Sequence, residues 1–307
     1  MEFLVSCSLS SRRQGEISLV KVNDKEEILD YYHIQKDPGV HEEGSQGMVV
    51  IDNDVYTGSA NKICKFRLDT LEYVSSSEAI TNSPYGAHGM AAGCAIKSDI
   101  HGICKNQDRL FCVFSDSDIL VEYDLDLKII KKYYTAEWNT EFSRYDKIGE
   151  KHVNSVFVDK NRDAYLTVHN HYNEGYVFKK NLDNWNSEPG HVVLTGLNQP
   201  HDYLQNDDGV AICDSNNTAL VVKRFPIEQS LCIDIGYYTR GLDYDNKNYY
   251  VGCTSREDGK KAIAIVPKDW LTRENRTVSY VYLPDATMPI DDNKFLCAEI
   301  YDVKRID

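Results

Sequence analysis

Short apolar segments alternate with polar turns along the whole chain, and the segments have the length and residue types of β-strands. One unit recurs: a short apolar strand, a turn at Asp or Asn, an aromatic and β-branched strand, a small or polar loop and a third strand. Its clearest copies begin at His101 (HGICKNQDRLFCVF) and His201 (HDYLQNDDGVAICD). Asn and Asp tolerate the left-handed backbone conformation that tight hairpins need. The pattern therefore predicts an all-β protein built from repeated antiparallel sheets.

The spacing of the repeat indicates a β-propeller. Aligned on their first residues, the copies begin at residues 46, 101, 154, 201, 240 and 288. The blades of common propeller families recur about every 40 to 50 residues. We expect a six-bladed β-propeller with four-stranded blades, in which residues 1–307 form a single domain.

The two ends of the chain complement each other. The N-terminus begins in the middle of a unit, with the strand-like segments FLVSCSL, EISLVKV and ILDYYHI, and the C-terminal part supplies the missing first strands. Sharing one blade between the termini closes the ring and removes free sheet edges. A β-sandwich and a right-handed β-helix are alternatives, but neither explains this complementarity.

The composition restricts the partners and the compartment. A net charge of −14 repels phosphate backbones and anionic lipids, which argues against nucleic acid and membrane partners. None of the nine cysteines forms a CxxC pair, which excludes a zinc ribbon, and several lie in apolar strand segments as expected of reduced, buried thiols. The apolar stretch near the N-terminus is short and lacks a preceding basic segment. We therefore expect a cytoplasmic protein without a signal peptide.

Two segments interrupt the repeat, residues 83–99 (Gly/Ala-rich, with His88) and residues 135–152 (with Trp138). Each precedes the first strand of a unit, so we expect both over the entrance of the central channel. Loops of this length are often lids or binding loops, although a decorated surface is the alternative.

The first strand of each blade lines the channel, and its opening residue faces the channel entrance. Reading that position around the ring gives Gln46, His101, Asn154, His201, Arg240 and either Thr287 or Met288. His152, His169 and His171 map near the same rim.

This ring predicts a small-molecule site. Imidazoles on neighbouring strands can hold a divalent metal, which activates water or polarises a carbonyl, or one of them can act as a general base without a metal. The candidate metal ligands are His101, His152, His169 and His201; the candidate catalytic residues are His201, Arg240 and Glu299; the candidate substrate-binding residues are Gln46, Asn154, Trp138 and His171. The alternative is structural: such a histidine often only binds a backbone carbonyl, Arg240 can cap carbonyls, and Glu299 can pair with a basic side chain.

The repeat and the ring resemble six-bladed propellers of the gluconolactonase, paraoxonase and NHL-repeat kind. The resemblance implies a calcium site at the channel mouth, with Asn154 in HVNSVFVD as the family's inner-strand Asn. Gln46 stands where that family has a Glu, and His101 and His201 stand where oxygen ligands are expected. Imidazoles suit zinc, iron or manganese better than calcium. The lyase domain of peptide-amidating enzymes is similar in using histidines from separate blades for zinc, with an Arg nearby.

Two functions are consistent with these features. The first is a hydrolase or lyase acting on a small polar molecule, and the second is a non-catalytic propeller that binds a glycan or a protein. A catalytic site predicts that the ring residues converge in a shared pocket, whereas a scaffold predicts that they bond to the backbone. On the catalytic hypothesis, the substitution His201→Ala costs activity or ligand affinity and little stability.

Overall fold

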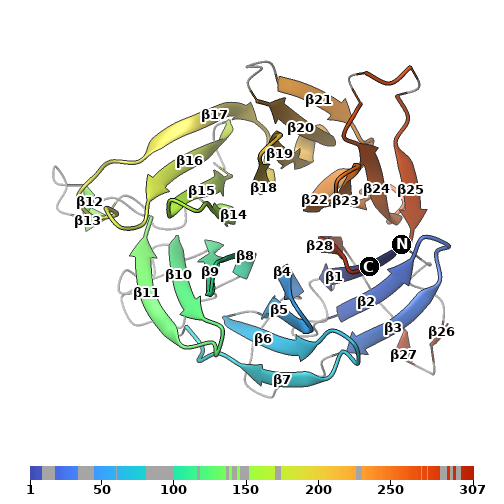
Figure 1. Ribbon diagram of the computed structural model, residues 1–307, viewed down its shortest axis with the longest axis horizontal. Coiled ribbons are helices and arrows are strands. Elements are labelled where there is room, and N and C mark those ends of the chain that lie inside the picture. Colours follow the sequence, from blue (N-terminus) through green and yellow to red (C-terminus); the bar gives the residue numbers. More distant parts are fainter. Residues whose placement is uncertain are drawn as a thin grey trace.

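The computed structural model shows a ring of β-sheets around a central axis (Figure 1). It describes residues 1–8, 18–33, 45–59, 61–80, 100–115, 118–135, 138–139, 144–145, 152–169, 174–225, 230–270, 272–274, 276–283, 289–290, 293–294 and 299–307.

The described residues form six four-stranded antiparallel sheets, which are the six blades. The closing blade has the order β28 (Glu299–Arg305), β1 (Glu2–Ser8), β2 (Ser18–Asn23) and β3 (Ile28–His33). Blade 2 contains β4 (Ser45–Ile51), β5 (Asp54–Ser59), β6 (Lys62–Arg67) and β7 (Tyr73–Ser76). Blade 3 contains β8 (Ile100–Asn106), β9 (Arg109–Phe114), β10 (Ile119–Asp124) and β11 (Ile129–Tyr134).

The next blades continue in chain order. Blade 4 contains β14 (Val153–Val158), β15 (Asp163–Val168), β16 (Gly175–Asn181) and β17 (His191–Leu197). Blade 5 contains β18 (Pro200–Asn206), β19 (Gly209–Asp214), the 3-10 turn η2 (Ser215–Asn217), β20 (Ala219–Arg224) and β21 (Ser230–Asp234). Blade 6 contains β22 (Tyr238–Tyr244), β23 (Asn248–Thr254), β24 (Lys261–Pro267) and β25 (Ser279–Tyr282). The predicted all-β, six-bladed propeller is confirmed.

The two termini share the closing blade, as predicted. Strand β1 pairs with β2 on one side and with β28 on the other, both antiparallel. The N-terminus therefore supplies three strands of this blade and the C-terminus supplies the innermost one. Figure 1 shows the two ends side by side, and the amino group of Met1 lies 3.4 Å from the Asp307 carboxylate.

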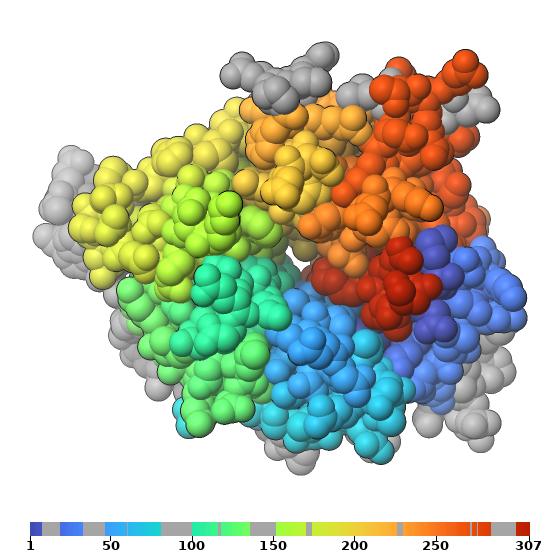
Figure 2. Space-filling model, viewed as in Figure 1, coloured from blue at the N-terminus to red at the C-terminus, as the bar shows by residue number. Residues whose placement is uncertain are grey.

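The hydrophobic core is divided among the interfaces between blades. Six clusters of buried residues each join two neighbouring blades, and together they complete the circle. Strand β19 contributes side chains to the interfaces on both sides of its blade. Val210 and Ile212 pack towards blade 4, while Ala211 and Cys213 pack towards blade 6, because successive side chains point to opposite faces. The space-filling view shows the resulting close packing around a narrow central opening (Figure 2).

The burial of the strands follows from this arrangement. Every residue of β19 is buried because both of its faces are covered, whereas the outermost strand β17 is mostly exposed. The described cysteines are all free thiols, in agreement with the expectation, although Cys232 on the outer strand β21 is exposed. Burial raises the pKa of the Cys64, Cys104 and Cys253 thiols to about 12, which leaves them unreactive.

The last repeat is displaced from its predicted position. The segment beginning at Met288 was expected to open the innermost strand, but that strand is β28, which begins at Glu299. Strands β26 (Pro289–Ile290) and β27 (Asn293–Lys294) instead form a separate two-stranded sheet. The sequence Asp-Asp-Asn-Lys in this segment resembles the turn sequences of the blades, and this similarity led to the wrong start for the last repeat.

Among the described residues, no helix has the length and apolar character needed to cross a membrane.

Candidate active site at the channel mouth

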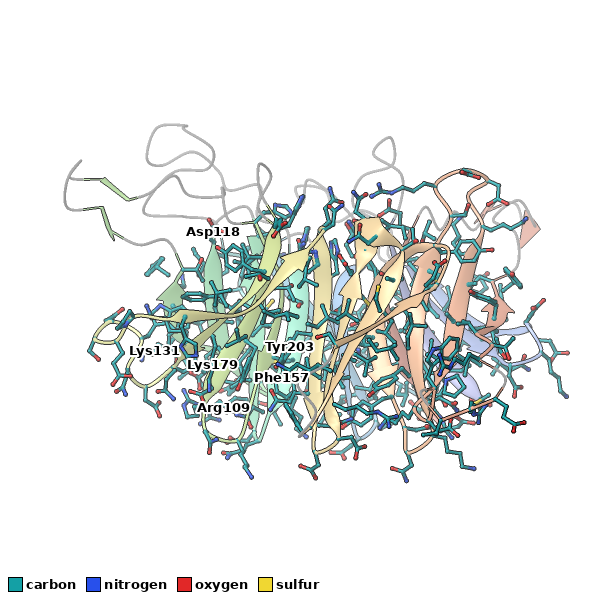
Figure 3. All side chains as sticks on the ribbon, turned by 90° about the horizontal axis from the view of Figure 1, so that it is seen from above. Arg109, Asp118, Lys131, Phe157, Lys179 and Tyr203 are labelled. Carbon is teal, nitrogen blue, oxygen red and sulfur yellow. The ribbon has the colours of Figure 1, made fainter. Side chains whose placement is uncertain are left out.

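The inner strands β4, β8, β14, β18, β22 and β28 all begin on the same face of the ring. In blade 3, the start of β8 at Ile100 pairs with Phe114 at the end of β9, and Asp118 follows in the adjoining turn. Figure 3 shows Asp118 on this face and Arg109 on the opposite face. We refer to the central part of the Asp118 face as the channel mouth.

A register shift interrupts every inner strand near its start. In blade 3, for example, Ile100 pairs with Phe114 and Gly102 pairs with Val113, so that His101 is the additional residue. The residues that fall at the shifts are Gly47, His101, Asn154, Asp202, Arg240 with Gly241, and Tyr301. Bulges of this kind redirect side chains and are frequent beside active sites. The six shifts therefore make the channel mouth the candidate functional region.

Three histidines gather at the channel mouth. The ring centroids of His101 and His152 are 4.9 Å apart, and those of His152 and His169 are 5.6 Å apart, both in edge-to-face arrangements. The aromatic ring of Tyr301 lies 6.1 Å from His101. His152 has a φ of 45°, which is uncommon for a residue other than glycine and is often found where function constrains the backbone. The structure thus brings together three of the predicted metal-binding histidines.

Asn154 orients the ring of His101. Its amide nitrogen donates a hydrogen bond to the carbonyl oxygen of Pro200 at 2.9 Å, which turns the amide oxygen towards His101. The His101 Nδ1 atom lies 3.0 Å from this oxygen and must carry a proton in order to donate to it. In the neutral ring the lone pair is therefore on Nε2, the atom that can accept a proton from another molecule.

Arg240 provides a positive charge beside this cluster. Its guanidinium carbon lies 4.3 Å from the ring centre of Tyr301 and 5.1 Å from that of Tyr238, so aromatic rings flank the cation. The Nη1 atom is 3.1 Å from a Glu299 carboxylate oxygen. Both Arg240 and Glu299, which were predicted as catalytic residues, therefore lie at the mouth and form an ion pair.

His201 is more deeply buried than His101, His152 and His169, with 6% of its surface exposed. Its Nδ1 atom lies 3.0 Å from the carbonyl oxygen of Gln199 and 2.7 Å from the hydroxyl oxygen of Ser215. The Ser215 hydroxyl donates to the carbonyl oxygen of Thr239, so the shared hydrogen bonds require a proton on His201 Nδ1. Burial, followed by the nearby charges of Arg240, His101 and His152, holds the His201 pKa well below its usual range. This histidine is therefore neutral and linked to the backbone.

These contacts predict a stability effect for His201→Ala. Removing the imidazole leaves buried acceptors without a donor, so we expect the free energy of unfolding to fall by about 1–3 kcal/mol. Chemical denaturation measures this loss, and His191→Ala on the exposed strand β17 serves as the control, with a change of about 0.5 kcal/mol or less. A His201→Ala variant of unchanged stability but lost ligand binding would contradict this structural role and support the role expected from the sequence.

Below the mouth, the channel holds charged residues that were not predicted. Asp202 accepts a hydrogen bond from the Gly241 amide at 2.7 Å, and Asp302 accepts one from the Met48 amide at 2.7 Å. Lys304 lies 2.8 Å from Asp302 and also donates to the Leu242 carbonyl oxygen at 3.1 Å. Burial and the neighbouring Asp302 raise the pKa of Asp202 to about 7, and burial also raises the pKa of Asp302. Asp202 directly follows His201 in β18. His201 keeps a regular pair with Cys213, whereas Asp202 falls at the register shift and has no such pair.

The raised pKa of Asp202 predicts a pH-dependent stability. Between about pH 4 and pH 7 the carboxyl is ionised in the unfolded chain but protonated in the folded one. The folded state then binds more protons, so its stability falls as the pH rises through this window. Asp202→Asn retains an acceptor for the Gly241 amide and carries no charge. We expect this variant to exceed the wild type in free energy of unfolding by about 1–3 kcal/mol at pH 8 and to equal it near pH 4.

Denaturation curves at the two pH values test this prediction, with Asp207→Asn in the exposed turn after β18 as the control. Equal stabilities of the Asp202→Asn variant and the wild type at pH 8 would contradict the raised pKa of this carboxyl.

The remaining predicted residues are only partly described. Gln46 lies in β4, but its side chain is outside the described residues, as are His88, His171, Thr287 and Met288. Trp138 belongs to the short strand β12 (Trp138–Asn139), which pairs with β13 (Arg144–Tyr145). Figures 1 and 3 place this hairpin at the outer edge of the ring and not over the channel.

The described residues contain no group of three or more His, Cys, Asp or Glu side chains in a metal-binding arrangement. The imidazoles of the mouth are of the right type for a transition metal, but they do not converge on a common point. Calcium requires several oxygen ligands, whereas at the mouth the Asn154 amide oxygen faces His101 and the Glu299 carboxylate is in an ion pair with Arg240.

Comparisons with known proteins identify the architecture. No protein-family model and no curated protein matches the sequence. Among solved structures, a chain of a nidogen/laminin complex superposes with a TM-score of 0.61 at 12% identity, covering 99% of this chain and 97% of that one. Streptogramin B lyase superposes with a TM-score of 0.54 at 12% identity, covering 93% and 88%. The calcium-binding protein regucalcin from Agrobacterium tumefaciens has a TM-score of 0.51 at 8% identity, covering 78% and 74%. The chain is thus a six-bladed β-propeller with the same overall fold as these solved structures.

Proposed function

We propose that the channel mouth is the active site of an enzyme that hydrolyses or eliminates a group from a small polar molecule by general acid–base catalysis. The observation that carries this proposal is the close approach of three imidazoles beside the Arg240 guanidinium at the channel mouth: His101 on the inner strand β8, His152 immediately before β14 and His169 immediately after β15. Two of the structural neighbours are named as a lyase and a luciferin-regenerating enzyme, which is compatible with catalysis on this fold.

The histidine cluster supplies the proton transfers in this proposal. His101 presents Nε2 as the base, because Asn154 fixes the proton on Nδ1. His152 lies between His101 and His169 and is placed to share or relay the proton. General acid–base catalysis by a positioned side chain contributes about 10²–10⁴-fold to a rate.

Arg240 supplies the electrostatic part. A fixed cation stabilises the negative charge that develops on an oxygen when water attacks a carbonyl or when a proton is removed beside one. The flanking rings of Tyr301 and Tyr238 hold the guanidinium in place and exclude water from its faces. The guanidinium therefore requires little reorganisation during the reaction.

A substrate screen tests the proposal. Purified protein is assayed against small lactones, esters and compounds with a leaving group β to a carbonyl, with and without EDTA, and its metal content is measured by elemental analysis. We expect turnover that is insensitive to EDTA and declines at low pH as the imidazoles become protonated. Turnover that is lost with EDTA and restored by zinc, iron or manganese would replace the metal-free chemistry with the metal-assisted chemistry that the sequence also allows.

A non-catalytic propeller that binds a glycan or a protein is the second candidate. It is favoured by the structural neighbour taken from a complex of two proteins and by exposed apolar residues on outer strands, such as Tyr73 and Val74 on β7. Absence of turnover across the screen, together with a glycan or protein ligand whose binding is unaffected by substitutions at the mouth, would establish this function instead.

A further inference from the structure

We propose that the molecule bound at the channel mouth carries a carboxylate, and that Arg240 is the group that binds it. This inference rests on the proposed function, because it names the substrate class of the same site.

The first observation is that Arg240 has unused hydrogen-bonding capacity in a buried position. Its side chain is 13% exposed, and its Nε and Nη1 atoms are buried without a hydrogen-bond acceptor among the described residues. Only Nη2 donates such a bond, to the Tyr238 hydroxyl at 3.3 Å. Buried donors of a charged group are rarely left unsatisfied, because each one costs free energy. A ligand oxygen would satisfy them.

The second observation is that the internal counter-ion is poorly placed. The Glu299 carboxylate oxygen is 3.1 Å from Arg240 Nη1, but the contact does not have hydrogen-bond geometry. The Glu299 side chain is 37% exposed, so water screens its attraction to Arg240. A ligand carboxylate with better alignment would displace it.

The third observation is the concentration of positive charge at the mouth of an acidic protein. Arg256 stacks on Tyr238 with its guanidinium carbon 3.9 Å from the ring centre and donates to Asn216, and it makes no ion pair within the described part of the chain. Arg240 and Arg256 thus lie against the same tyrosine in a chain with a net charge of −14. A local cationic region enclosed by low-dielectric walls attracts anions.

The geometry favours a carboxylate over a phosphate. Tyr301 and Tyr238 flank the guanidinium, which leaves its in-plane N–H groups as the available donors. A planar carboxylate matches in-plane donors, whereas a tetrahedral dianion needs further donors outside that plane.

The experiment is a binding titration that does not depend on turnover. Benzoate, benzamide and inorganic phosphate are titrated into the protein at low ionic strength, with calorimetry or the histidine NMR signals as the readout. We expect saturable, millimolar binding of benzoate that weakens with added NaCl, and at least tenfold weaker binding of benzamide and phosphate.

Variants assign the binding to Arg240. We expect Arg240→Gln to weaken benzoate binding at least tenfold and Glu299→Gln to strengthen it several-fold by removing the competing carboxylate. Arg67→Gln, at the exposed last residue of β6 in blade 2, should leave the binding unchanged. If Arg240→Gln does not fold, the proposal is tested by two other variants. We expect Glu299→Gln to bind benzoate more tightly and Arg256→Gln to bind it more weakly than the wild type. Equal binding of benzoate and benzamide, tighter binding of phosphate, or a Glu299→Gln variant with unchanged affinity would overturn the proposal.

The two proposals fail separately. Carboxylate binding without turnover in the substrate screen would support this inference and contradict the proposed catalytic function. Turnover of neutral substrates by the wild type, without detectable binding of benzoate, would leave the proposed enzyme intact and contradict the carboxylate-binding role of Arg240.

Discussion

A chain that lacks residues 1–8 is expected to lose its cooperative fold. These residues form β1, and the side chains of Phe3, Leu4, Val5 and Cys7 have no exposed surface. Removing four buried apolar side chains costs roughly 6–12 kcal/mol, which is comparable to the total stability of a typical domain. The deletion also leaves the facing edges of β28 and β2 without hydrogen-bond partners, which promotes aggregation.

Thermal and chemical unfolding followed by circular dichroism measure this effect. Deletion of the exposed C-terminal Asp307 is the control, and it should change the midpoint little because that residue lies outside β28. A chain without residues 1–8 that unfolds cooperatively at the wild-type temperature would show that ring closure does not depend on the shared blade.

Much of the fold could be predicted because a propeller repeats its strand pattern. The copies beginning at His101, Asn154 and His201 fall one residue after the actual starts of β8, β14 and β18. Turn residues and alternating apolar positions recur in each blade, and these are local properties that a sequence displays directly. The last blade was misplaced because its segment from Met288 has the same turn chemistry, although the innermost strand begins at Glu299.

The site was predicted less completely because it depends on the register shifts. A shift adds one residue to the inner strand without changing the hydrophobic pattern of the rest, so the sequence does not reveal which residue is displaced. His101 and Asn154 were named because they open their repeat copies, and they are also the displaced residues of their strands. In β18 the displaced residue is Asp202, whereas His201 keeps a regular pair with Cys213 and lies in the interior. Tyr301 was missed for the same reason.

His152→Gln is expected to have a large effect on catalysis, because in the proposed mechanism His152 passes on the proton that His101 takes up. The ring of His152 lies between those of His101 and His169, and its backbone holds an unusual positive φ immediately before β14. Glutamine has a similar size and remains polar, but it cannot exchange a proton near neutral pH. On the proposed mechanism we therefore expect kcat/KM to fall by about 10²–10⁴-fold, with stability close to that of the wild type.

The most direct test of the site compares kcat/KM for the best substrate of the screen in the wild type, in His152→Gln and in His191→Gln. His191 lies on the outer strand β17 and is exposed, so its replacement is a matched substitution away from the channel. If the channel mouth is the active site, His152→Gln loses at least 100-fold while His191→Gln stays within about twofold of the wild type. A folded His152→Gln variant that retains wild-type kcat/KM would contradict the assignment of catalysis to the channel mouth.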